Sequence, residues 1–245
     1  MAQETSNQAR MLAQIRNALG RAAPVVPDPL PPFDSHIPTA GNASLVETFT
    51  RELEKVGGQV SCARTTAELR QRLQDLCAPQ EYASVAVSAG DVLRQLGLRD
   101  WLVAADRQVI PTLEESMTTN AASKLNSVDE YKQLLMEADL GITCADYALA
   151  DTGTLVLVSG GEQHRLISLL PPVHICVLDP RNIFASLTDF LAHRQQADNE
   201  QGSPTPGAIT FITGPSRTAD IEHAITMGIH GPGALEVVLC SANEN

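Results

Sequence analysis

The sequence predicts an α/β protein whose sheet is largely parallel. Between residues 44 and 240 the spacing of hydrophobic residues switches repeatedly between a period of 2, as in strands, and 3.6, as in helices. Residues 173–178 form a near-continuous apolar run bounded by prolines, which is typical of a strand covered on both faces. With 245 residues, 43% of them hydrophobic, the chain is long enough for one large domain or two small ones with real cores.

Two parts are predicted along the chain. Residues 1–43 hold a short amphipathic helix over 9–19, which we expect to serve docking, and a tether over 24–38 that is crowded with prolines. Each proline lacks an N–H donor and fixes φ, so the tether is neither helix nor central strand. Residues 44–245 form the α/β domain.

The first elements of that domain follow from local patterns. Leu45, Phe49 and Leu53 line one face of a helix that extends to Val56 and stops at Gly57-Gly58, before a strand over 59–62. Thr65 stands three residues before Glu68, a capping-box arrangement that opens a helix running to Leu76. A strand over 82–88, a short helix over 91–96, a strand at 101–103 and a helix over 128–138 follow by the same reasoning.

Short strands dominate the middle of the domain. Their predicted ranges are 140–144, 147–149, 152–159 and 173–178. Asp151-Thr152-Gly153 is predicted to be a tight turn, because glycine adopts positive φ at no steric cost. His174 lies inside the apolar run, which indicates a hydrogen-bonded core histidine rather than a ligand.

The last part of the chain is predicted to end in a βαβ unit. Apolar residues share one face of a helix over 183–191, and the polar residues 195–206 are expected to form an exposed loop. The closing elements are a strand over 209–213, a helix over 218–227 and a strand over 235–240.

Charge and cysteine usage exclude several classes of function. The formal net charge of −12 repels nucleic acid and anionic membranes. The apolar stretches fall short of the roughly 20 residues that span a bilayer, so we expect no membrane insertion. Five scattered cysteines without a C-x-x-C pair predict reduced, mostly buried thiols in a cytoplasmic protein that binds no metal and no iron–sulfur cluster of its own.

The most suggestive candidate site is the strand-to-helix transition predicted around Gly214. Ser216 or Thr218 is expected to cap the helix, whose N-terminus offers free N–H groups to an anion, and Arg217 adds a fork of donors for a carboxylate or phosphate. The alternative is a purely structural cap with a solvated arginine. His230, next to Gly231 in a glycine-rich turn, is a candidate acid/base, or else a hydrogen-bonding spacer.

A second candidate region runs from Asp146 to Arg165. Asp146 and Asp151 are five residues apart and fall on opposite faces of a continuous strand, so the spacing alone does not make them an acid/base pair. His164 and Arg165 close a glycine loop that either binds an anion or is an exposed hairpin tip. Phosphate-loop, dinucleotide, nucleophile-elbow and zinc-protease motifs are absent.

Together these blocks resemble the LUD-domain family over about residues 140–240. The matching segments are 145–154, Arg165 with 168–171, 214–222 and 228–232, and the family usually carries Glu where this chain has Asp151. The resemblance implies a three-layer α/β/α fold like that of ribose-5-phosphate isomerase, glucosamine-6-phosphate deaminase and CoA-transferases. It also implies a place in a three-component system that oxidises L-lactate to pyruvate, in which partner subunits carry the iron–sulfur clusters.

Three hypotheses remain open at the level of sequence. The first is a cluster-free subunit of the lactate-oxidising system that binds a small carboxylate or phosphate, with Asp151 and His230 as catalytic candidates. The second is a stand-alone enzyme acting on a phosphosugar or acyl-CoA, and the third is a non-catalytic scaffold. The residues expected to bind the ligand are Thr152, Gly153, Thr154, Arg165, Gly214, Ser216, Arg217, Thr218, His230 and Gly231.

Overall fold

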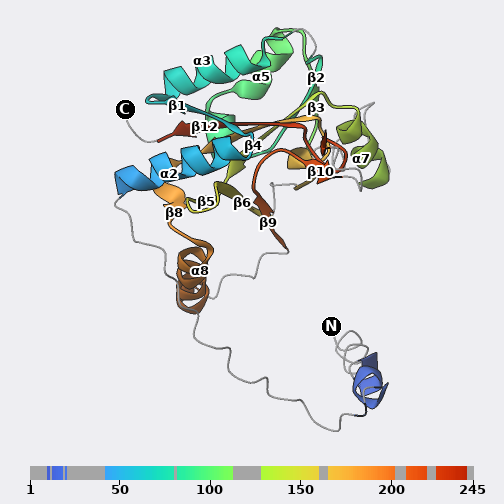
Figure 1. Cartoon of the computed structure of the whole chain (residues 1–245). Coiled ribbons are helices and arrows are strands. Elements are labelled where there is room, and N and C mark those ends of the chain that lie inside the picture. Colours follow the sequence, from blue (N-terminus) through green and yellow to red (C-terminus); the bar gives the residue numbers. More distant parts are fainter. Residues whose placement is uncertain are drawn as a thin grey trace. The chain divides into compact units, whose positions relative to one another are not determined.

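The computed structural model (Figure 1) divides into two units, residues 1–36 and residues 37–245. It describes residues 10, 11, 13–18, 20, 42–79, 82–112, 128–159, 165–201, 208–219 and 225–241. In the first unit, residues 10, 11 and 13–18 are helical, which confirms the helix predicted there. The proline-rich tether over 24–38 lies outside the described residues.

The second unit is built on a six-stranded sheet in which every neighbouring pair is parallel. The sheet confirms the predicted α/β class with a largely parallel sheet. Its strands, in spatial order, are β1 (Gln59–Ala63), β12 (Ala234–Cys240), β7 (Val173–Leu178), β4 (Leu140–Ala145), β2 (Ser84–Val87) and β3 (Gln108–Ile110).

Helices α3 (Thr66–Cys77), α4 (Asp91–Gln95) and α5 (Leu98–Ala104) cover one face of this sheet. Their buried leucines pack on Val85, Ile142 and Val177 of the strands. Thr65 caps α3 as predicted: its hydroxyl accepts the Glu68 N–H at 3.1 Å, while the Glu68 carboxylate accepts the Arg64 N–H at 2.8 Å. Capping satisfies donors that the first turn of a helix leaves free.

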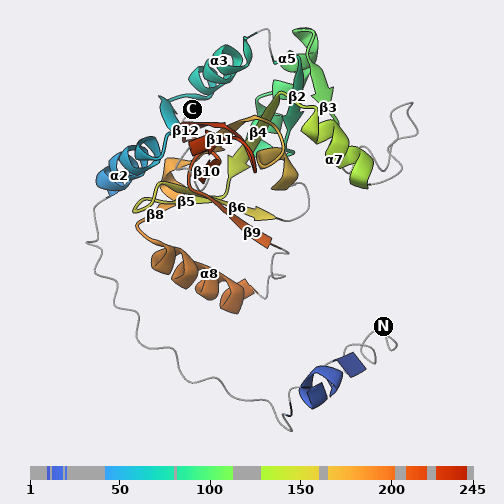
Figure 2. The same cartoon turned by 45° about the vertical axis from the view of Figure 1, so that its right-hand side comes forward.

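The other face is covered by α2 (Asn42–Lys55), α7 (Val128–Met136) and a second sheet (Figures 1 and 2). The three-layer arrangement therefore holds, with strands in one outer layer. The second sheet is mixed, and its strands in order are β8 (Ile183–Phe184), β5 (Tyr147–Leu149), β6 (Thr154–Ser159) and β9 (Ala208–Ile212). Helix α8 (Leu187–Gln201) packs on this sheet through Phe190.

Strand β7 shows why the central strands read as apolar runs. Ile175 and Val177 belong to the core on the α3 side, whereas Cys176 and Leu178 belong to the core under α2. His174 is fully buried on this strand, with its Nε2 2.8 Å from the Thr143 hydroxyl oxygen. The prediction of a hydrogen-bonded core histidine is confirmed, and burial lowers its pKa to about 4.

Two short elements differ from the prediction. Residues 101–103 belong to α5 rather than to a strand, because Leu98 and Leu102, one helical turn apart, are buried together. The neighbouring strand β3 has three residues, which are too few to show the alternation of apolar and polar residues that identifies a strand in a sequence. Residues 183–184 pair with β5, and the following helix starts only at Leu187 and continues through 195–201, where a loop was expected.

The predicted helix over 218–227 is wrong in both of its described parts. Strands β10 (Arg217–Ala219) and β11 (Ile225–Met227) form an antiparallel hairpin instead, and residues 220–224 lie outside the described residues. Thr218 pairs with Thr226, and β-branched side chains favour strand over helix at such positions. Because β9 joins the second sheet and β12 the first, the chain does not end in a βαβ unit.

Candidate functional site

Most of the predicted binding residues meet in one cavity of about 500 Å³, which we call the cationic cavity. Its walls come from the 3-10 turn η1 (Arg165–Ser168) with the residue after it, from β9, from the turn after β9, and from residues 230–232. The predicted residues that line it are Arg165, Gly214, Ser216, Arg217, His230 and Gly231.

Ser216 holds the two turns of this cavity together. Its N–H donates to the Pro232 carbonyl at 2.8 Å, and its own carbonyl accepts the Gly228 N–H at 2.9 Å. Its hydroxyl lies 3.4 Å from the His230 backbone nitrogen, which donates to it. Ser216 was expected to cap a helix, and the hairpin replaces that role with bonds between turns. The hydrogen-bond donors around the cavity therefore come from side chains and from the backbone of turns, and not from a helix N-terminus.

The cavity is positively charged in a strongly acidic chain. Arg165, Arg217 and His230 line it, and no Asp or Glu does so in the part of the chain that the structure describes. Neither arginine makes an ion pair with a described residue. In a chain with a net charge of −12, a local cluster of positively charged side chains attracts anions to that place. Arg165 and Arg217, which were expected to lie near one another, line the same cavity, whereas the helix N-terminus expected beside them is absent from the described residues.

Helix α2 positions the turn that carries Arg217. The Arg217 guanidinium lies against Gly57, so close that a Cβ there would meet its Nη2 at 2.4 Å, and Gly214 packs on Val56 in the same way. Both contacts fall just beyond the C-terminal end of α2, where the helix dipole favours a cation. Residues far apart in sequence therefore set the direction of this arginine.

The remaining predicted residues lie next to the cavity rather than in its wall. Gly153 packs against the backbone of α2, and Thr218 lies in β10. Thr152 and Thr154 join their hydroxyls at 2.7 Å, and Thr154 reaches the hydroxyl of Thr213, which lines the cavity, at 2.9 Å.

Asp151 stands at the end of this hydroxyl chain that lies opposite to Thr213. Its Oδ1 accepts the Thr152 hydroxyl at 3.2 Å. The Asp151 carboxylate does not line the cationic cavity, so the structure connects it to the cavity only through Thr152, Thr154 and Thr213. Of the two catalytic candidates, His230 alone lies in the wall.

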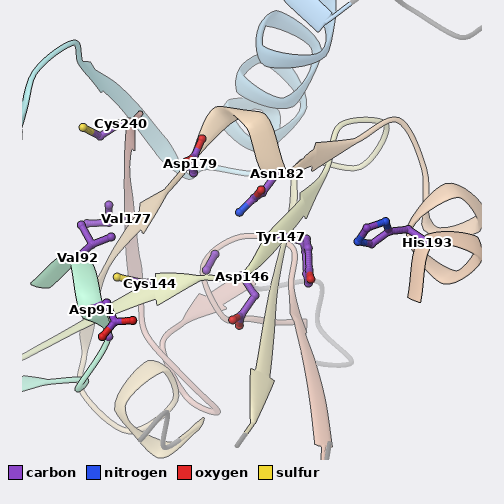
Figure 3. Close-up of a pocket in the computed structure, with 12 residues that line it drawn as sticks. Asp91, Val92, Cys144, Asp146, Tyr147, Val177, Asp179, Asn182, His193 and Cys240 are labelled. Carbon is purple, nitrogen blue, oxygen red and sulfur yellow. The ribbon is translucent and has the colours of Figure 1, made fainter. Parts of the chain in front are cut away.

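A second cavity, of about 510 Å³, escaped the sequence reasoning (Figure 3). It lies where β4, β7 and β12 end and where the loop after β2 enters α4, with Cys144, Val177, Cys240 and Gly90 in its wall. Ligands of open parallel sheets bind at the carboxyl ends of strands, so this rule finds the place once the strand order is known. The order itself depends on pairings that no local pattern shows.

The second cavity has the opposite charge to the first. Asp91, Asp146 and Asp179 line it together with His193, and Figure 3 shows their side chains around the opening. Arg94 pairs with Asp91, and Arg181 pairs with Asp179, its Nη2 lying 2.6 Å from Oδ2. The Asp146 carboxylate accepts the Val158 N–H at 2.7 Å, and burial raises its pKa.

Four of the five cysteines pack into the fold, as predicted for most of them, whereas Cys62 on β1 is exposed. Cys77, Cys176 and Cys240 are buried, and Cys144 is partly buried. Burial raises the pKa of the thiols of Cys77 and Cys144 to about 12, so both are protonated at neutral pH. Among the described residues no three His, Cys, Asp or Glu side chains gather closely enough to hold a metal ion. Within the same residues, no helix has the length and apolar character to cross a membrane.

These features define a three-layer α/β protein with two ligand-sized cavities, one at the carboxyl ends of the central parallel strands and one beside β9 of the second sheet. The family is given by sequence: the LUD domain matches residues 46–240, and the chain belongs to the LUD-domain family. The crystal structure of a DUF162 family protein from Deinococcus radiodurans has a similar fold, with a TM-score of 0.54 and 20% identity. That likeness covers 82% of this chain and 99% of the other.

Several relatives carry the name lactate utilization protein C. The protein of that name from a Geobacillus species is 31% identical over 189 residues, 77% of this chain and 74% of the relative. The one from Anoxybacillus flavithermus is 31% identical over 68% of this chain and 67% of the relative. The one from Halalkalibacterium halodurans is 41% identical over 39% of this chain, and the match spans 41% of that relative's length.

Proposed function

We propose that this protein takes part in lactate utilization and binds an organic anion in the cationic cavity. The names of its relatives support the first part of the proposal. The second part depends on one observation: Arg165, Arg217 and His230 share a cavity without a described carboxylate, in a chain with a net charge of −12.

The chemistry of the cavity suits carboxylates such as lactate and pyruvate. A guanidinium offers two parallel N–H donors to a carboxylate, and charged hydrogen bonds of this kind are about twice as strong as neutral ones. The hydroxyls of Thr213 and Ser216 and the Gly231 backbone add polar partners around the arginines. His230 also lines the cavity and is exposed, so its imidazole is accessible to a bound anion.

The proposal places the chain in a multi-subunit lactate-oxidising system in which partner subunits carry the iron–sulfur clusters. The scattered cysteines of this chain support that division of labour, since cluster ligands normally stand in closely spaced groups. The chain then contributes anion binding, and the partners contribute electron transfer.

Co-purification from lactate-grown cells tests this assignment. We expect the tagged chain to bring down iron-containing partners, and lactate oxidation by the assembly to fall when the chain is deleted. If the purified chain alone turned over a phosphosugar or an acyl-CoA, a stand-alone enzyme would be indicated instead. If the complex assembled and oxidised lactate at full rate with the cavity destroyed, the chain would be a scaffold.

The site is tested by two variants with a matched control. Arg165→Ala and Arg217→Ala should each slow growth on L-lactate at unchanged protein abundance. Arg70→Ala removes the same charge from the exposed face of α3, away from the cavity, and should leave growth unaffected. Normal growth of both cavity variants would refute the anion site.

A further inference from the structure

The cationic cavity is larger than lactate requires. The six non-hydrogen atoms of lactate fill at most about 180 Å³, if each takes the roughly 30 Å³ that one water occupies in the liquid. The cavity measures about 500 Å³, within the range of roughly 300–1,000 Å³ typical of sites for larger organic ligands. A three-carbon acid would leave most of this volume to water.

Part of the cavity wall is apolar and uncovered. Leu169 and Phe211 line it and are 45% and 44% exposed, whereas most leucines of this fold are buried. The Leu169 side chain lies beside the Gly231 turn, because a Cβ on Gly231 would lie 3.7 Å from its Cδ1 and 3.5 Å from the Ser216 Cβ. Apolar side chains beside charged ones at the mouth of a cavity favour a ligand that has both characters.

The position of Phe211 is fixed by packing from behind. Its ring meets that of Phe190 edge-on, with centroids 6.2 Å apart and an interplanar angle of 85°. Phe190 is fully buried between α8 and the second sheet, so the contact holds one edge of the half-exposed Phe211 ring against a fixed partner. The Phe211 part of the apolar wall is therefore preorganised, and little ordering of that ring is required when a ligand covers it.

We propose that the ligand of the cationic cavity is an organic anion with an apolar body larger than a three-carbon acid. Its carboxylate or phosphate faces Arg165, Arg217 and His230, and its apolar part covers Leu169 and Phe211. This inference rests on the proposed anion site and specifies the class of molecule that occupies it. The geometry favours a ligand with a ring or a branched chain attached to the acidic group.

Four probes separate the anionic end from the apolar body. The purified full-length chain is titrated with L-lactate, 3-phenyllactate, inorganic phosphate and phenyl phosphate, and binding is followed by calorimetry and by shifts of backbone NMR signals. Burying the phenyl ring on the apolar wall should make each phenyl compound bind about tenfold more tightly than its parent anion, or better. The carboxylate and phosphate pairs show which acidic group the arginines prefer.

Matched leucine variants locate the effect. Leu169→Ala should reduce the advantage of 3-phenyllactate over lactate to about twofold or less, and so should Phe211→Ala. Leu191→Ala is the control, because Leu191 is exposed to a similar extent, 51%, but lies on α8 outside the cavity wall. It should leave the tenfold advantage unchanged.

The outcomes distinguish this inference from the proposed function. If none of the four probes binds, the anion site itself is wrong. If lactate binds as tightly as 3-phenyllactate and phosphate as tightly as phenyl phosphate, the site stands and the apolar-body proposal fails. That comparison uses the unmodified chain, so it decides the matter even if a variant does not fold. A phenyl advantage that survives both Leu169→Ala and Phe211→Ala also overturns the proposal.

Discussion

Replacing Gly153 by alanine should destabilise the domain through one contact between the β5–β6 turn and helix α2. Gly153 has a φ of +62°, and a Cβ at this position would lie 2.3 Å from the Leu53 backbone nitrogen and 2.7 Å from the Glu52 carbonyl carbon. Neither atom belongs to a side chain that can rotate away. The substitution therefore has to push the turn and the helix apart.

The cost follows from two separable effects. A left-handed conformation costs a non-glycine residue roughly 1–2 kcal/mol, of which about 0.4–1 kcal/mol is offset because alanine restricts the unfolded chain. Overpacking adds about 1–3 kcal/mol, since moving α2 also loosens Phe49 and Leu53, which are both fully buried. Gly153→Ala should thus lower the free energy of unfolding by about 2–4 kcal/mol.

Gly97 provides the matched control. Its φ of +59° is nearly the same, but nothing lies within 4 Å of the place where a Cβ would stand. Gly97→Ala should therefore show only the backbone cost, about 0.5–1 kcal/mol. Thermal and urea unfolding of both variants measure the difference, which should be about 2 kcal/mol, or roughly 4–8 °C in Tm for a domain of this size. Equal losses in the two variants would refute the contact argument.

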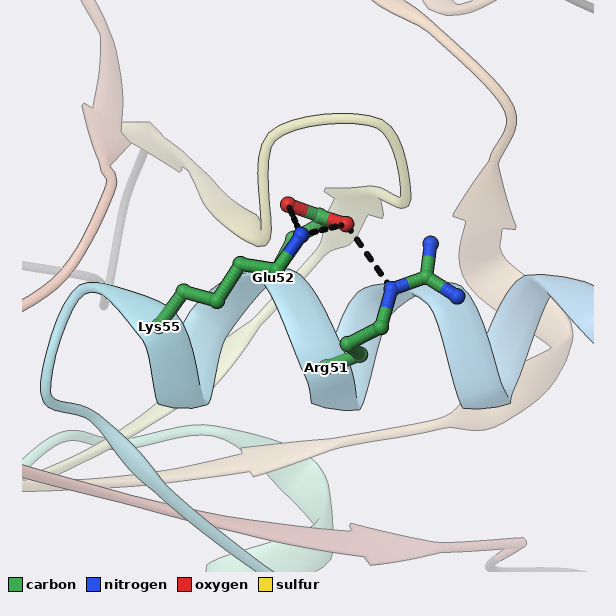
Figure 4. Close-up of polar contacts among 3 residues, drawn as sticks. All are labelled: Arg51, Glu52 and Lys55. Atoms are coloured by element: carbon green, nitrogen blue, oxygen red, sulfur yellow. Dashed lines mark hydrogen bonds and ion pairs between the residues drawn. The ribbon is translucent and has the colours of Figure 1, made fainter.

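Helix α2 carries an ion-paired surface at the point of this contact (Figure 4). Lys55 Nζ lies 2.8 Å and 2.9 Å from the two carboxylate oxygens of Glu52, and Arg51 Nε lies 3.0 Å from one of them. The hydrogen bond from Lys55, followed by that from Arg51, lowers the Glu52 pKa. Exposed pairs contribute little to stability, so packing of the turn decides the outcome of the glycine test.

Three further predictions concern buried polar groups. His174 has a pKa of about 4, below its ordinary 6.5, so the unfolded chain binds the proton first and the free energy of unfolding falls as the pH drops from 6.5 towards 4. In His174→Gln, the loss of unfolding free energy between pH 7 and pH 5, measured by urea unfolding, should be about 2 kcal/mol smaller than in the unmodified chain. Thr154→Val interrupts the hydroxyl chain at a buried position and should lower the free energy of unfolding by about 1–2 kcal/mol. Thr213→Val, at the exposed end of the hydroxyl chain, should lower it by about 0.5 kcal/mol in the same urea unfolding assay, and equal losses would contradict the hydrogen-bonded chain of hydroxyls. Burial raises the Asp146 pKa above its ordinary 3.8, so stability falls as the pH rises from 3.8 through the raised pKa. Asp146→Asn can still accept the Val158 N–H and should be at least as stable at pH 7, and this advantage should vanish in acid denaturation near pH 3.

Elements whose signal is local were predictable from the sequence. The helix that ends at Gly57-Gly58, the Thr65 cap and strand β7 are written in a few neighbouring residues, and all three appear where they were expected. The tight turn at Asp151–Gly153 is likewise confirmed, with its glycine at positive φ. In each case the backbone conformation is decided by spacing or by one special residue.

The hairpin at the end of the chain shows where local reasoning fails. Apolar residues between 218 and 227 fit a helical face, but Thr218 and Thr226 pair across two strands. The choice between the two depends on which partner satisfies the backbone, and the Ser216 bonds to Pro232 and Gly228 favour the hairpin. Ser216 and Arg217, at the start of this hairpin, still line the cationic cavity, although no helix begins there.

The sequence by itself determined the class of fold, most of the elements and the charged and glycine residues that surround the cationic cavity. Only the tertiary structure decided the strand order, the second sheet and the acidic cavity at the carboxyl ends of the central strands. The physical reason is range: periodicity and capping act over a few residues, whereas contacts such as Thr154 with Thr213, 59 positions apart, arise only when the whole chain buries its apolar faces together.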